Sequence, residues 1–98
     1  MSRPGYVYLM ANHRRGRTYL GVTSNLARRV WEHRNGLGSK YAIEHDCKLL
    51  VWFEAHDDIQ DARQRELTMK KWKRPWKIEL IEKDNSEWHD LYETIQWN

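Results

Sequence analysis

Arg29 and His33 are a pair whose types and spacing could hold an anion. They are four residues apart in a segment, residues 25–34, that the apolar spacing predicts to be helical. Residues i and i+4 project from the same face of a helix, and here that face borders the apolar arc on the side of Leu26. An arginine held at such a border is partly immobilised, as a phosphate clamp requires. The alternative is an arginine whose stem covers the edge of the core.

Glu66 is the second candidate, because it interrupts the apolar stripe formed by Ile59, Ala62 and Met69. It is also the only acid within residues 63–77, a segment with seven basic residues. An unpaired buried carboxylate would take up a proton, so Glu66 must pair with a nearby Arg or Lys or bind a cation. A divalent ion such as Mg²⁺ needs only one protein carboxylate if water and a substrate phosphate complete its shell. Spacing alone leaves both interpretations open.

A β-hairpin is expected near the start of the chain. Residues 6–10 and 18–22 are short segments rich in β-forming side chains, which predicts two strands. Residues 12–17 lie between them and supply turn-forming Asn and Gly. The two strands should therefore pair in an antiparallel manner and bring their side chains next to the helix that follows.

The helix over residues 25–34 should begin at a cap formed by Thr23 or Ser24, and Asn35, Gly36 and Gly38 should end it. The apolar run from Lys48 to Ala55 predicts a central strand covered on both faces.

Three later segments are predicted to be helical. The first runs from about residue 57 to 73, with acids at its start and lysines at its end, and Arg74-Pro75 breaks it. Residues 76–83 favour helix over strand, and residues 88–95 form a final helical segment. The predicted fold class is α+β, a small three-stranded sheet with helices packed against it.

The tryptophans are expected mainly to pack in the core and between helices, although they could stack on bases: Trp31, Trp52, Trp72, Trp76 and Trp88.

The charge is unevenly distributed along the 98 residues, which carry 17 Lys and Arg against 14 Asp and Glu. Residues 1–40 hold eight basic residues and one acid, and residues 63–77 hold seven basic residues and one acid. Residues 41–62 and 78–98 are acidic. A basic face would suit a polyanion such as nucleic acid. Solvated helix faces are the alternative.

Length and composition restrict the class of protein. Ninety-eight residues predict one domain, because two hydrophobic cores would each be too small to be stable. A single cysteine excludes a disulfide framework and suits a reducing cytoplasm. We see neither an apolar run long enough to span a membrane nor an export signal, so no membrane association is expected.

Two tyrosine-containing motifs with ten residues between them are followed, in order, by four polar residues: Tyr6-Val7-Tyr8, Tyr19-Leu20-Gly21, Arg29, His33, Glu66 and Asn85. This ordered set resembles the GIY-YIG nuclease domain over about residues 5–85. The likeness is greatest to the small stand-alone bacterial members of that family. The first motif differs in having Tyr6 where the family has glycine, although Gly5 immediately precedes it.

The resemblance implies a role for each residue of the set. Glu66 would be the sole protein ligand of one Mg²⁺ or Mn²⁺ ion that contacts the scissile phosphate. Arg29 would hold that phosphate from the other side. Tyr8 and Tyr19 would surround the attacking water. One of them would act as the general base, and the resemblance does not determine which. His33 would hydrogen-bond a tyrosine hydroxyl.

Two further roles complete the set. Asn85 would brace the site from outside, and Gly21 would permit close backbone packing beside it. We also assign phosphate-backbone contacts to exposed basic residues: Arg14, Arg15, Arg17, Lys40 and Lys70.

The resulting hypothesis is a cytoplasmic, metal-dependent endonuclease that hydrolyses DNA phosphodiester bonds, with DNA repair or processing as one setting consistent with it. The alternative is a nucleic-acid-binding module that does not cleave, or that cleaves only with a partner. A structural adaptor with an acidic docking face is a third interpretation. DNA is favoured over RNA as the nucleic acid, and a protein partner or a homodimer stays open.

Overall fold

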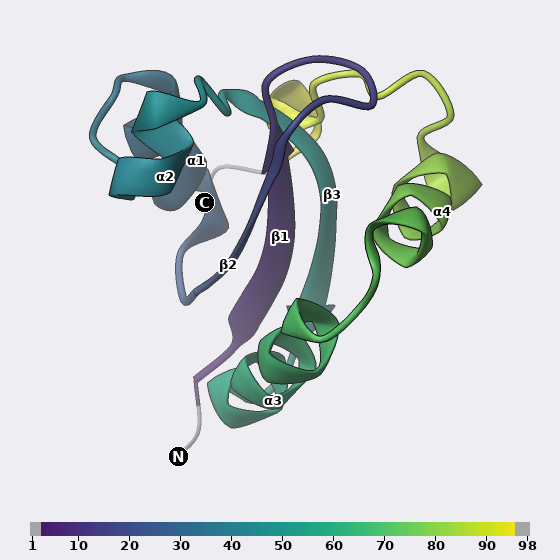
Figure 1. Cartoon of the computed structure of the whole chain (residues 1–98). Helices are drawn as coiled ribbons and strands as arrows, with labels where there is room; N and C mark the ends of the chain where they lie inside the picture. The colour runs from purple at the N-terminus through teal and green to yellow at the C-terminus, as the bar shows by residue number, and fades with distance from the viewer. Residues whose placement is uncertain (1–2, 96–98) are drawn as a thin grey trace.

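The computed structural model describes residues 3–95 and consists of a three-stranded antiparallel sheet with helices on both faces (Figure 1). The elements in chain order are β1 (Gly5–Ala11), β2 (Thr18–Thr23), α1 (Leu26–Arg34), α2 (Lys40–Glu44), β3 (Leu49–His56), α3 (Ile59–Lys70), α4 (Arg74–Asp84) and a 3₁₀ turn (Tyr92–Thr94). The predicted α+β class and the predicted hairpin are both confirmed.

β1 is the middle strand, and its alternating side chains divide the core in two. Val7, Leu9 and Ala11 belong to a cluster that includes buried residues of α3 and α4. Tyr8 and Met10 point to the opposite face and belong to a cluster with buried residues of α1 and α2. Successive residues of a strand face opposite sides of a sheet, so β1 presents one set to each layer of helices. Tyr8 is thereby placed beneath α1.

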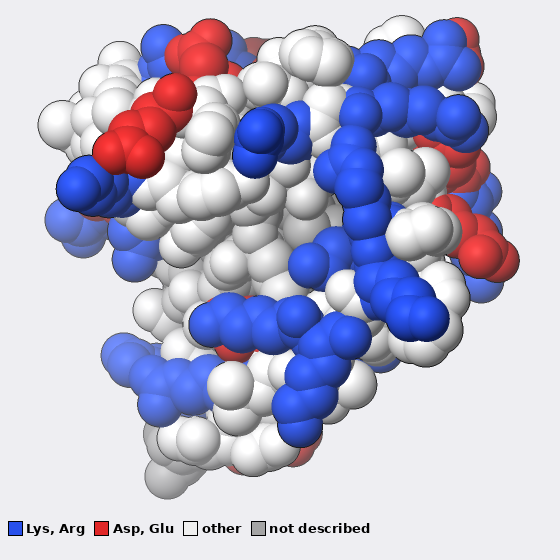
Figure 2. Space-filling view, viewed as in Figure 1, with Lys and Arg blue, Asp and Glu red and all other residues white. Residues whose placement is uncertain are grey.

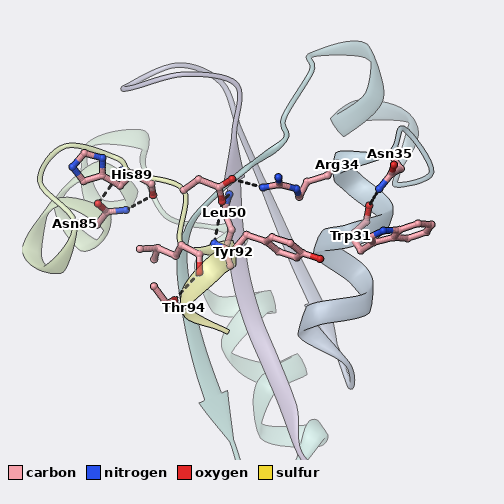
Figure 3. A network of polar contacts seen from close by, with 10 residues as sticks. Trp31, Arg34, Asn35, Leu50, Asn85, His89, Tyr92 and Thr94 are labelled. Carbon is pink, nitrogen blue, oxygen red and sulfur yellow. Dashed lines mark hydrogen bonds and ion pairs between the residues drawn. The ribbon is translucent and has the colours of Figure 1, made fainter. Parts of the chain in front are cut away.

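The prediction that the apolar run of β3 forms the central strand is wrong, because the strand order is β2-β1-β3. β3 is nevertheless covered at its outer edge by the C-terminal segment. The Asp90 carboxylate accepts a hydrogen bond from the Leu50 amide at 3.1 Å, and the Leu91 amide donates to the Leu50 carbonyl at 2.7 Å (Figure 3). An edge strand satisfied in this way can carry the apolar sequence of an interior strand.

The helices begin and end close to the predicted positions, with small differences. The cap of α1 is Asn25, whose side chain accepts from the Arg28 amide, and not Thr23 or Ser24. α3 begins after Asp58, which caps it, and ends at Lys70, three residues earlier than predicted. α4 includes Arg74, because Pro75 is tolerated in the first turn of a helix.

Two short segments differ more. Residues 88–95 do not form the predicted helix and contain only the 3₁₀ turn, because this stretch crosses the edge of β3. The helix α2 was not predicted, since its five residues carry too little periodicity.

The tryptophans are partly as predicted. Trp52 and Trp88 are buried, whereas Trp31 and Trp76 are about half exposed, which contradicts a core role for these two. Trp76 does pack edge-on against Trp72, between α3 and α4, as predicted for helix packing. Among residues 3–95, no helix is both long and apolar enough to cross a membrane.

Candidate active site

A buried hydrogen bond joins the hairpin to α1 beneath the surface of the site. The Tyr8 hydroxyl lies 2.9 Å from Nε2 of His33, and the two side chains are 1% and 3% exposed. Two glycines allow this packing. A Cβ atom on Gly21, which faces Tyr8 across the hairpin, would lie 2.5 Å from the Tyr8 hydroxyl, and one on Gly38 would lie 2.2 Å from Nδ1 of His33.

Tyr19 lies over this pair and is only partly buried. Its ring centroid is 5.2 Å from that of His33 and 6.3 Å from that of Tyr8. The two tyrosines come from neighbouring strands, with Tyr19 opposite Met10 and Tyr8 opposite Gly21, so both side chains emerge on the α1 face of the sheet. Tyr19 is therefore the tyrosine that solvent and a ligand can reach.

Arg29 and Glu32 approach the same cluster from α1. The Arg29 side chain is 43% exposed, and its guanidinium lies 3.4 Å from the Glu32 carboxylate, which is also 3.7 Å from Arg28. Both charges act on the buried pair. Arg29 lowers the pKa of Tyr8 and of His33, and Glu32 raises the pKa of both. An exposed ion pair of this kind is weak and can be exchanged for a phosphate contact.

Glu66 lies on α3, which contacts both β1 and β2. Its side chain is only 13% exposed, and its carboxylate lies 3.3 Å from the ammonium group of Lys70 one turn later. The predicted pairing with a nearby lysine is thus observed. The charge of Glu66 is the smallest of the influences that raise the pKa of Tyr8. The helix α3 therefore holds a mostly buried carboxylate within electrostatic range of Tyr8.

Burial sets the protonation states at the base of the cluster. It raises the pKa of Tyr8 far above its ordinary value, and the nearby Tyr19 hydroxyl adds to the effect while Arg29 opposes it. Burial also lowers the pKa of His33, and Arg29 lowers it further. Tyr8 therefore remains a phenol and His33 a neutral imidazole. Nδ1 of His33 has no hydrogen-bond partner within residues 3–95.

The lowered pKa of His33 predicts that acid destabilises the fold. The unfolded chain binds a proton near pH 6.5 that the native chain resists, so stability is complete above that pH and falls as the pH drops through the window below it. We expect the free energy of unfolding to decrease by up to about 1.4 kcal/mol per pH unit in this window. Urea unfolding of wild type and His33→Gln at pH 7 and 5.5 measures it, and parallel pH dependences would contradict this origin.

Comparison with known proteins identifies the family. Residues 4–79 match the family model described as the GIY-YIG catalytic domain. The chain belongs to the GIY-YIG family. It is 40% identical over 63 residues to a UPF0213 protein of Clostridium perfringens, an alignment covering 64% of this chain and 68% of that protein. It is 32% identical over 76 residues to a UPF0213 protein of Staphylococcus saprophyticus, covering 78% of this chain and 92% of the relative. No solved structure gives a significant match.

GIY-YIG membership implies a nuclease with a nucleic-acid substrate and general use of divalent metal ions. The names of the UPF0213 relatives state no activity. Glu66 suits a hard divalent ion, because it is a carboxylate held in place by partial burial, and its partner Lys70 is 58% exposed and free to move away. Within residues 3–95 no three His, Cys, Asp or Glu side chains converge, so water and substrate phosphate would supply the other ligands.

Asn85 lies at the C-terminal end of α4, where it connects a loop to the outer edge of β3 (Figure 3). Its amide group donates to the Val51 carbonyl at 3.1 Å and to the His89 carbonyl at 2.9 Å, and its oxygen accepts from the His89 amide. These bonds hold the loop that leads to Asp90. They do not join Asn85 to the tyrosine cluster, in contrast to the hydrogen bond of His33.

These contacts predict that Asn85→Ala destabilises the protein. The change leaves buried carbonyl and amide groups unpaired, each of which costs about 1–3 kcal/mol. We expect the free energy of unfolding to fall by at least about 2 kcal/mol. Asn35→Ala is the matched control, since Asn35 also bonds a backbone carbonyl but is exposed. Equal losses in the two variants, measured by urea unfolding, would contradict this interpretation.

Most of the predicted phosphate contacts are already engaged in ion pairs. Arg14 pairs with Glu87 at 3.1 Å and Lys40 approaches Glu44 at 3.9 Å, although Lys40 is 90% exposed. Arg15 makes two bonds of 2.7 Å to Glu82, whose pKa is held down to about 2 by Arg15 and Trp88. Arg17 has no ion-pair partner within residues 3–95.

Three residues of the site were missed by sequence reasoning. Glu32 carried a usable signal, because it is the only acid within residues 1–40, just as Glu66 is the only acid in its own basic segment. Gly38 was assigned only to ending the helix, and its contact with His33 depends on tertiary packing. Tyr41 stacks near Tyr19, with centroids 6.4 Å apart, and comes from the short unpredicted helix α2.

Proposed function

We propose that this chain is a metal-dependent endonuclease that hydrolyses phosphodiester bonds in DNA. The observation that carries the proposal is the approach of Tyr19 and Arg29 to the buried Tyr8–His33 pair, with the charge of Glu66 within electrostatic range of Tyr8. These side chains come from β2, α1 and α3, and we assign them the roles of a phenol, a phosphate-binding cation and a metal-binding carboxylate. That combination suits attack of water on a phosphate.

Each side chain then has a distinct task. Arg29 binds a non-bridging oxygen of the scissile phosphate once the weak pair with Glu32 opens, and it stabilises the charge that develops there. Glu66 would hold the divalent ion, which would supply polarisation of the phosphate and favour ionisation of water. Glu32 keeps Arg29 oriented in the free protein.

Tyr19 is proposed as the residue whose ionised form, a phenolate, receives the proton of the attacking water and becomes a neutral phenol. A general base must come within hydrogen-bond distance of that water, and Tyr19 is partly exposed whereas Tyr8 is 1% exposed. Burial also raises the pKa of Tyr8 and keeps it protonated. Tyr8 and His33 thus act as positioning residues that form the floor under the Tyr19 ring.

A cleavage assay tests the proposal. The purified protein is incubated with labelled single-stranded, duplex and branched DNA in Mg²⁺ or Mn²⁺, with EDTA as the metal-free control. We expect internal cleavage that requires the added ion. Cleavage that persists in EDTA would contradict the metal-dependent mechanism, and salt-sensitive binding without cleavage in either ion would instead support a non-cleaving binding module.

A further inference from the structure

A basic groove lies beside the tyrosine cluster, on the face shown in Figure 2. It has a volume of about 660 Å³ and is bordered by the hairpin loop, by α2, and by the residues around the start of α4. Its lining includes five basic or imidazole side chains and two aromatic rings: His13, Arg15, Arg17, Arg74, Lys77, Tyr41 and Trp72. Figure 2 shows Lys and Arg running from the hairpin loop past α4 and over α3, around a largely uncharged centre.

The walls of this groove are fixed by hydrogen bonds. The Arg74 guanidinium donates to the backbone carbonyls of Arg15 and Gly16 at 2.6 and 2.7 Å. The Arg15 side chain binds Glu82 of α4 through two bonds. The hairpin loop is therefore attached to α4 at several points, and the groove between them exists before any ligand binds. A preformed site avoids the entropic cost of ordering a loop on binding.

Two cations in the groove remain available to a ligand. Arg17 is exposed and Lys77 is partly exposed, and within residues 3–95 neither has an ion-pair partner. Arg14, Arg15 and Lys40 differ in this respect, since each faces a carboxylate. The first turn of α4 carries no acid and no side-chain cap, so the positive end of its dipole is not offset there. The groove therefore has excess positive potential.

The groove is continuous with the candidate active site through Tyr41. This residue lines the groove and its ring lies 6.4 Å from that of Tyr19, while Thr18, the first residue of β2, lines the groove next to Tyr19 in sequence. We propose that this groove binds the phosphate backbone of the nucleic-acid strand that flanks the scissile phosphate, with Arg17 and Lys77 each contacting one phosphate. The proposal rests on the proposed function, and it adds where the substrate strand runs.

The test measures binding separately from cleavage. Fluorescence anisotropy of a labelled oligonucleotide is recorded in EDTA between 50 and 200 mM salt for wild type, Arg17→Gln, Lys77→Gln and the double variant. Lys83→Gln is the matched control, because it removes the same charge from α4 at an exposed position outside the groove. Circular dichroism confirms that each variant is folded.

Each phosphate contact contributes about 0.7 to the slope of log affinity against log salt for single strands and about 0.9 for duplexes. We expect each single variant to lower the slope by this amount, and the double variant by about twice as much. Lys83→Gln should leave the slope at the wild-type value. Single-stranded and duplex DNA and RNA form separate arms, and the arm in which the double variant loses salt dependence identifies the nucleic acid that occupies the groove.

Two outcomes would overturn the groove proposal. One is an unchanged salt slope in the double variant while wild type binds, and the other is the absence of salt-dependent binding by wild type. Failure of the proposed function looks different, because a protein that binds through Arg17 and Lys77 but cleaves nothing in Mg²⁺ or Mn²⁺ retains the groove and loses the nuclease. The two proposals can therefore fail independently.

Discussion

Glu66→Gln is expected to lower the rate of DNA cleavage by about 10³-fold or more, with little change in stability. Gln keeps the shape of the side chain and an oxygen atom but loses the negative charge that a divalent ion requires. Metal-ion stabilisation of a transition-state phosphate is worth several kcal/mol, and each 1.36 kcal/mol is tenfold in rate. The measurement is a single-turnover cleavage rate across a titration of Mg²⁺ and Mn²⁺.

The competing interpretation of Glu66 is a purely structural pair with Lys70. Such a pair spaced i, i+4 contributes about 0.3–0.5 kcal/mol, which cannot account for a thousandfold loss of activity. Glu44→Gln is the matched control, because Glu44 is also a helical glutamate near a lysine four residues away, in α2. If both variants cleave at the wild-type rate, Glu66 holds no catalytic metal.

Local patterns were sufficient to predict the strands of the hairpin and the long helices, because each depends on short-range periodicity and on caps. The order of the strands was not predictable in this way. The apolar run of β3 indicated burial on both faces, and both faces are packed against helices. Its outer edge, however, is covered by the Asp90–Leu91 segment and not by a neighbouring strand. Such covering depends on contacts between residues 40 apart.

A β-bulge is a second reason why the packing of β3 was not predictable from the sequence. The register of β1 with β3 shifts between Leu9 and Met10, so that Val51 and Trp52 both belong to the cluster with α3 and α4. A simple alternation assigns these neighbours to opposite faces. The extra residue bends an edge strand, which sequence periodicity does not reveal.

The sequence predicted which residues belong to the candidate site better than it predicted how they contact one another. Spacing placed Arg29 and His33 on one helix face, and the lone acid in a basic segment drew attention to Glu66. The sequence spacing did not show that Tyr8 and His33 are buried together. The glycines that permit this contact lie in different places in the fold, Gly21 in β2 and Gly38 after α1. Burial is what distinguishes the two tyrosines.

Tyr19→Phe is expected to lower the rate of the chemical step by about 10² to 10⁴-fold, the usual contribution of a general base. The change removes only the hydroxyl of a partly exposed ring whose packing against His33 and Tyr41 does not need it. The free energy of unfolding should therefore stay close to the wild-type value. The measurement combines single-turnover cleavage with urea unfolding of the same preparation.

Tyr8→Phe should give the opposite division between activity and stability. It removes the partner of Nε2 of His33 at a position that is 1% exposed, and an unpaired buried polar atom costs about 1–3 kcal/mol. Folded Tyr8→Phe protein should still cleave faster than Tyr19→Phe, since Tyr8 only supports the ring that meets the water. A larger loss of the chemical rate in Tyr8→Phe than in Tyr19→Phe would reverse the assignment. Tyr8 would then have to leave its buried position to reach the water, and the hydrogen bond to His33 would have to break before each turnover.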